Sequence, residues 1–88
     1  MIKRSKYLIL VFLFLSLFAT GQVNIRHFMT MGRNALMDND FASAVQYFNV
    51  IINHEPDLFE PYFLRGVAKY NLGDYQGAER DFSVSIMR

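Results

Sequence analysis

The side chains that could bind a metal ion or act as a general base are few and widely separated. His27 and His54 are the two histidines, and neither has a second histidine at helical spacing. A zinc site on a helix needs two ligands on one face, so we expect both histidines at the surface and predict no metal site. The chain contains no cysteine. This excludes a disulfide framework, a thiolate zinc site and a cysteine nucleophile.

The other groups with catalytic potential are better explained as structural. Ser83 and Ser85 have no histidine close to them in the sequence, and no glycine motif for binding phosphate is present. Four aspartates stand where the helical pattern breaks, a place where such side chains cap helices: Asp38, Asp40, Asp57 and Asp74. We therefore predict no catalytic residues, no cofactor and no enzymatic activity.

Charge argues against nucleic acid as a partner. Residues 22–88 carry six basic and eight acidic side chains, a net charge of −2 with the histidines neutral. No basic stripe is left to follow a phosphate backbone, so we expect a protein or peptide partner instead.

The first element along the chain is an apolar block. Residues 1–21 combine Lys3, Arg4 and Lys6 with an apolar run from Tyr7 to Phe18 and small residues that end at Gly21. This order is typical of a secretory signal peptide cleaved before Gln22, with only transient membrane contact. The alternative is a permanent membrane anchor, but the apolar run is shorter than the about 20 residues that a spanning helix needs.

The rest of the chain repeats itself at a constant offset, with position 40 matching position 74. Two short segments carry the clearest copy, DNDFASAVQYF at residues 38–48 and LGDYQGAERDF at residues 72–82. At this offset small residues match small ones and aromatic residues match aromatic ones. The matched pairs are Gly32 and Gly66, Asp40 and Asp74, Phe41 and Tyr75, Ala44 and Ala78, Phe48 and Phe82, and Ile52 and Ile86.

This period resembles the tetratricopeptide repeat family, whose unit is a helix–turn–helix of about 34 residues. The resemblance covers residues 25–88 and is strongest over Tyr62–Ile86. It implies an all-α fold in which two antiparallel helix-turn-helix repeats stack as the start of an α-solenoid, preceded by the signal peptide. Unit 1 would span residues 25–58, and unit 2, which looks incomplete, would span residues 59–88. The predicted helices lie near residues 25–37, 41–54, 58–72 and 75–87.

Turn chemistry supports these breaks. Gly73 can take the left-handed conformation that ends a helix, and Asp40 and Asp74 can cap the helices that follow. Asp57 and Glu60 have the spacing of a capping box, which predicts a third helix start.

Small and aromatic residues at matched places predict the packing. A glycine inside a helix costs about 1 kcal/mol relative to alanine, so Gly32 and Gly66 imply a close approach of the partner helix, which we expect opposite Ala44 and Ala78. The predicted structural positions are Gly32, Ala44, Phe48, Gly66, Gly73, Tyr75, Ala78 and Phe82. Arg65 and Lys69 depart from the family pattern, because apolar residues usually stand there. We expect their stems to cover apolar surface, their charged heads to reach water, and this helix to pack less securely.

The first helices of tetratricopeptide units line a concave groove that holds a peptide or protein segment. Carried over by position, the resemblance implies a binding stripe formed by Arg26, Met29, Arg33, Leu36, Glu60, Phe63, Val67 and Tyr70. Equally, these residues could pack against a neighbouring repeat. Family members that grip a C-terminal carboxylate use Lys and Asn here; among the residues at those places only Arg33 could serve, so we do not predict that mode.

The resemblance thus implies a non-enzymatic scaffold for protein–protein interaction in an exported bacterial protein of the periplasm or cell envelope. Two alternatives stay open: the exported sensory or ligand-binding front of a larger signalling protein or enzyme, and an envelope assembly factor. Because about three units are needed for a stable array, we expect further repeats or self-association, and exposed apolar surface beside Phe82 and Ile86.

Overall fold

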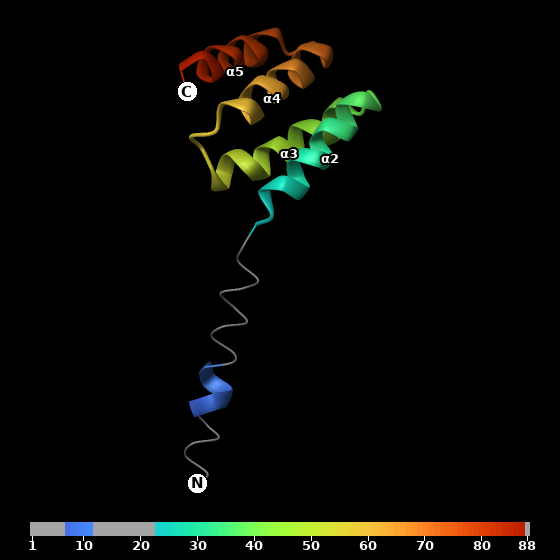
Figure 1. The fold of residues 1–88 in the computed structure, drawn as a ribbon. Helices are drawn as coiled ribbons and strands as arrows, with labels where there is room; N and C mark the ends of the chain where they lie inside the picture. The colour runs from blue at the N-terminus through green and yellow to red at the C-terminus, as the bar shows by residue number, and fades with distance from the viewer. Residues whose placement is uncertain (1–6, 12–22, 88) are drawn as a thin grey trace.

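The computed structural model describes residues 7–11 and 23–87 of the 88-residue chain. Four helices follow one another: α2 (Ile25–Met37), α3 (Phe41–His54), α4 (Phe59–Asn71) and α5 (Tyr75–Met87). Each packs against the next in antiparallel order, and α2 also touches α4, so α2 and α5 lie at the two ends of the array (Figure 1). No strand occurs among the described residues. The all-α prediction is confirmed, and the four predicted helices agree with the observed ones to within one residue.

The predicted signal peptide lies largely outside the described residues. Of residues 1–21, the structure describes residues 7–11, a short helical stretch whose side chains are exposed. Within the described ranges, every helix is too short or too polar to span a bilayer.

The turns inside the two helix pairs are built in the same way. Asn39 and Gly73, which occupy matching places in the two units, both have positive φ angles, 59° and 86°. The N–H of the next residue then reaches back across the turn, from Asp40 to the Ala35 carbonyl at 2.8 Å and from Asp74 to the Lys69 carbonyl at 2.9 Å. These are the long hydrogen bonds of a Schellman motif, which ends a helix by satisfying its last carbonyls.

Aspartate side chains start the second helix of each pair, as predicted. Asp40 is the N-cap of α3, and its carboxylate accepts from the Ser43 N–H at 3.2 Å. Asp74 precedes α5 and accepts from the Gly77 N–H at 2.9 Å. Each satisfies an N–H that has no partner within its helix.

The connection between α3 and α4 differs from the prediction. The N-cap of α4 is Leu58, so the helix begins one residue later than the predicted capping box of Asp57 and Glu60 places it. Glu60 pairs with Arg33 on α2. The loop is tied down by the Tyr62 hydroxyl, which donates to the Pro56 carbonyl at 2.8 Å.

The glycines admit rings of the partner helix. A Cβ added to Gly32 would lie 2.5 Å from the Phe48 ring, and one added to Gly66 would lie 2.7 Å from the Phe82 ring. The close approach that the sequence predicted is therefore present in both units, and the nearest side chains at it are the two phenylalanines. The apolar core of the described helices consists of Ala35, Ala44, Phe48, Ile51 and Ala68.

Candidate functional site

The eight residues predicted to bind a peptide lie on two helices that contact each other. Four are on α2 and four on α4. Their side chains range from half-buried, as at Met29 and Val67, to exposed, as at Phe63 (49% exposed) and Tyr70 (58% exposed). We call this set the α2–α4 surface: Arg26, Met29, Arg33, Leu36, Glu60, Phe63, Val67 and Tyr70.

An ion pair joins the two helices on this surface. The Arg33 guanidinium donates to a carboxylate oxygen of Glu60, and both side chains are about half exposed. An exposed pair of this kind contributes at most about 1 kcal/mol to stability. Its larger consequence concerns ligands, because the arginine that could hold a peptide carboxylate already has an anionic partner.

Aromatic rings make up much of what is exposed beside that pair. The Phe63 ring lies 5.6 Å from the Phe82 ring, and the Tyr70 ring lies 5.1 Å from the Tyr75 ring, measured between centroids. Ring pairs at such distances attract each other and hold their orientation. A hollow of about 140 Å³ opens next to Met29 at the start of α4. The surface therefore offers rigid aromatic and apolar contacts with few unpaired charges.

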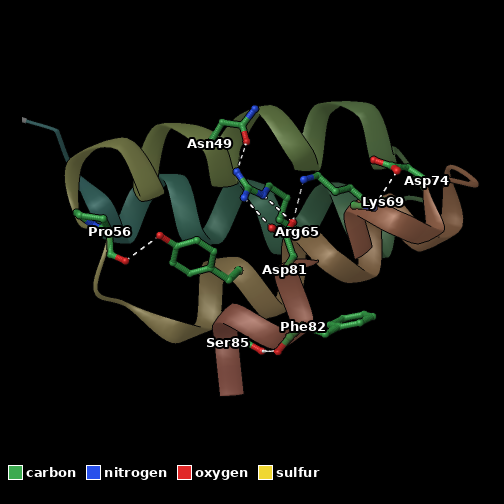
Figure 2. Close-up of polar contacts among 10 residues, drawn as sticks. Asn49, Pro56, Arg65, Lys69, Asp74, Asp81, Phe82 and Ser85 are labelled. Atoms are coloured by element: carbon green, nitrogen blue, oxygen red, sulfur yellow. Dashed lines mark hydrogen bonds and ion pairs between the residues drawn. The ribbon is translucent and has the colours of Figure 1, made fainter. Parts of the chain in front are cut away.

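A buried polar cluster fastens α4 to both of its neighbours, and the sequence analysis missed it. The Arg65 guanidinium donates twice to the Asp81 carboxylate on α5, at 2.8 and 2.7 Å, and once to the Asn49 side-chain oxygen on α3, at 2.8 Å. Lys69 lies 3.1 Å from the same carboxylate. Figure 2 shows these side chains converging between the helices. Arg65 also lies over the ring of Tyr62, 5.7 Å from its centroid.

This geometry corrects the expectation for Arg65 and Lys69. Their side chains are 17% and 21% exposed, so the charged heads are turned inward rather than toward water. Unit 2 is consequently held by charge-assisted hydrogen bonds where a loose helix was predicted. A signal was present in the repeat itself, because at the matching places of unit 1 Met31 stands for Arg65 and Tyr47 for Asp81. Two apolar positions that change together to opposite charges indicate an ion pair.

Opposing effects act on the Asp81 carboxyl. Burial would raise its pKa, because the charged form loses water. The hydrogen bonds and positive charges of Arg65 and Lys69 outweigh that effect and hold the pKa below its ordinary value of 3.8. Asp81 is therefore ionised at neutral pH, and the cluster carries two cations and one anion.

The histidines lie apart from both features. His27 and His54 are exposed, and the His54 Nδ1 lies 3.0 Å from the Val50 carbonyl of its own helix. The described residues contain no group of three or more histidine, cysteine or acidic side chains that could hold a metal ion.

The described residues form an all-α fold of two helix hairpins stacked in sequence. Exposed aromatic rings lie on α4, and an ionic cluster joins α4 to α3 and α5. Comparison of the chain with protein-family models, with curated proteins and with solved structures found no match.

Proposed function

We propose that the chain is a protein-binding module of the tetratricopeptide type and that the α2–α4 surface holds a segment of a partner protein. The observation that supports this most is the contact between α2 and α4, with the rings of Phe63 and Tyr70 exposed on α4. Large exposed rings at fixed positions are the side chains that most often dominate binding energy at protein interfaces. The two internal turns of the same construction and the constant offset of the repeat support the family assignment.

The proposed ligand is a segment with apolar anchors. Because Glu60 already accepts from Arg33, a peptide carboxylate would have to compete for that guanidinium. Met29, Phe63 and Tyr70 instead offer apolar contact over an extended stripe. This suits a helix or extended segment whose apolar side chains recur along one side.

A peptide-display library selected on the protein tests the proposal. Selected peptides should shift the amide NMR signals of Phe63, Val67 and Tyr70, and the double variant Phe63→Ala, Tyr70→Ala should bind at least about tenfold more weakly. His54→Ala, on an exposed residue of α3, is the matched control and should bind as the parent chain does. Selected peptides that shift signals elsewhere and bind the double variant unchanged would contradict the proposal.

We further propose that the protein is exported and that residues 1–21 are removed. The basic start, the apolar run and the small residues that end at Gly21 support this. The mass of the protein recovered from an envelope fraction should correspond to a chain that begins at Gln22, and retention of Met1–Gly21 would contradict cleavage.

A further inference from the structure

The second helix of unit 1 is covered, and the second helix of unit 2 is not. Phe48 on α3 is fully buried and Ile52 is partly buried, in the helix against which α4 packs. The residues at the matching places on α5 are Phe82, which is half-buried, and Ile86, which is 85% exposed. Among the described residues the same surface therefore occurs twice, once with a helix on it and once without.

The uncovered surface is continuous. Tyr75, Glu79, Phe82, Ser83 and Ile86 recur on α5 at three- and four-residue steps and line a hollow of about 310 Å³; we call these five residues the α5 face. Single exposed apolar residues are ordinary, but an apolar row along one helix marks an interaction surface.

The covered copy shows what kind of element fits. Ala68 of α4 belongs to the core cluster that contains Phe48, and Leu64 packs against that cluster. A leucine and an alanine four residues apart on α4 therefore contribute to the packing on α3. The small side chain of Ala68 is fully buried. An amphipathic helix with this spacing is what the surface of α3 accepts.

Polar contacts fix the register of that helix. Arg65 of α4 donates to Asn49 of α3 at 2.8 Å. The two helices are antiparallel, so Lys69, one turn after Arg65, lies level with Val45, one turn before Asn49. A helix placed on α3 in this register therefore carries a cation at the level of Val45, although in α4 that cation is turned toward Asp81 of α5.

On α5, the residue in the place of Val45 is Glu79, and the residue in the place of Asn49 is Ser83. No cation stands three or four residues from Glu79 on α5, and no described residue forms an ion pair with it. An incoming helix with α4's register would bring a cation to this unpaired carboxylate.

We propose that the α5 face binds an amphipathic helix of a partner protein, in the register that α4 adopts on α3, with a leucine and an alanine over Phe82 and a lysine or arginine beside Glu79. This surface adjoins the α2–α4 surface at two places, because Phe63 contacts Phe82 and Tyr70 lines the same hollow. The partner helix would extend the stack by one element and bury Phe82 and Ile86.

A second copy of this chain fits the α5 face poorly. In α2, the positions equivalent to Leu64 and Ala68 are Thr30 and Asn34, which are exposed and polar, so head-to-tail stacking would press polar groups onto apolar ones. Antiparallel pairing of two α5 helices would place both copies of Glu79 near the middle of the contact, and like charges there repel.

The test uses a synthetic helix that copies α4. The probe is a peptide of residues 58–72, capped at both ends, with a lactam bridge between substituted positions 63 and 67 to maintain the helix. Added to the isotope-labelled protein, it should shift the amide signals of Glu79, Ser83 and Ile86 in a saturable way. Changing lysine to glutamate at peptide position 69 should weaken binding about two- to fivefold, and Glu79→Lys in the protein should restore it.

Controls keep the outcomes distinct. Thr30→Lys, on the outer surface of α2, should leave peptide binding unchanged, and a thermal melt followed by circular dichroism confirms that each variant is folded. Absence of saturable shifts on α5 up to about 1 mM peptide would overturn the proposal. So would a concentration-dependent dimer, measured by light scattering, that Ile86→Glu abolishes and that excludes the peptide. The Phe63 and Tyr70 variant alters both surfaces, so it is not used to test the α5 face. The two proposals stay distinguishable because one is tested by amide shifts on α4 and the other by amide shifts at Glu79, Ser83 and Ile86.

Discussion

The two helix pairs share one backbone design and differ in the side chains of their second helices at two matching places. In unit 1, Ile51 is fully buried and Tyr47 is half-buried. In unit 2, Ser85 and Asp81 stand at the same two places, and Arg65 holds the aspartate. The turns and the contact between glycine and phenylalanine occur in both pairs. The difference teaches that the turn and the contact between glycine and phenylalanine specify the geometry of a pair. The other side chains that pack in the pair can be apolar or ionic.

The largest expected effect comes from the two matched phenylalanines. Phe48→Ala should cost about 3–5 kcal/mol of unfolding free energy, because the ring is fully buried and its removal leaves a cavity. Phe82→Ala should cost clearly less, because that ring is still partly exposed. Urea unfolding of both variants measures the difference. Equal losses would mean that the α5 face is covered in solution.

Removing the anion of the ionic cluster should have the next largest effect. Asp81→Ala leaves Arg65 and Lys69 buried without their partner, which should cost about 3 kcal/mol in the same urea measurement. The matching side chains of unit 1 supply the control: Arg65→Met, Lys69→Ala and Asp81→Tyr together copy Met31, Ala35 and Tyr47 into unit 2. This triple variant, which leaves no buried cation without its partner, should recover most of the loss. If it is as unstable as Asp81→Ala, the packing side chains of unit 1 cannot replace those of unit 2.

The sequence predicted the elements of this fold better than their contacts. Helix ends were predictable because local chemistry decides them: Asp40 and Asp74 cap, and Gly73 turns left-handed. The inward turn of Arg65 was not predicted, because the spacing along α4 says nothing of a carboxylate on another helix.

The α2–α4 surface was likewise predictable in its placement but not in its contacts. The placement of its eight residues on two helices follows from periodicity. The pairing of Arg33 with Glu60 depends on how α2 and α4 sit together, and a capping box had been assigned to Glu60 on spacing alone.

Alanine at the two glycines probes the shared part of the design. Gly32→Ala should destabilise by about 1–3 kcal/mol, because its Cβ would overlap a ring that cannot move away. Gly66→Ala meets the Phe82 ring, which has open space beside it, so the cost should be smaller. The helix propensity gained from alanine offsets about 1 kcal/mol in both variants. Thermal melts of the two variants measure which loses more stability. A larger loss in Gly66→Ala than in Gly32→Ala would contradict the expectation.

Acid should weaken unit 2 selectively. The pKa of Asp81 in the folded chain is lowered, so its contribution is present above the unfolded pKa, about 3.9, and is lost as pH falls through the folded value. Arg65 and Lys69 are the charged groups that face the carboxylate. The stability difference between the parent chain and Asp81→Asn should be constant from about pH 7 to 5 and shrink below about pH 4. A parent chain that instead gains stability relative to Asp81→Asn as pH falls from about 6 would indicate a raised pKa.

The smallest effect separates the two otherwise equal turns. Asn39 and Gly73 hold the same left-handed position, but only glycine does so without a steric penalty on its own backbone. Asn39→Gly should therefore stabilise the chain by under about 1 kcal/mol, and Gly73→Asn should destabilise it by a similar amount. Nothing lies within 4 Å of a Cβ at Gly73, so this cost is conformational and not a clash. Because the turns belong to separate pairs, the double exchange should sum to nearly zero in a urea titration. A sum well away from zero would show that the two turns hold their helices with different geometry.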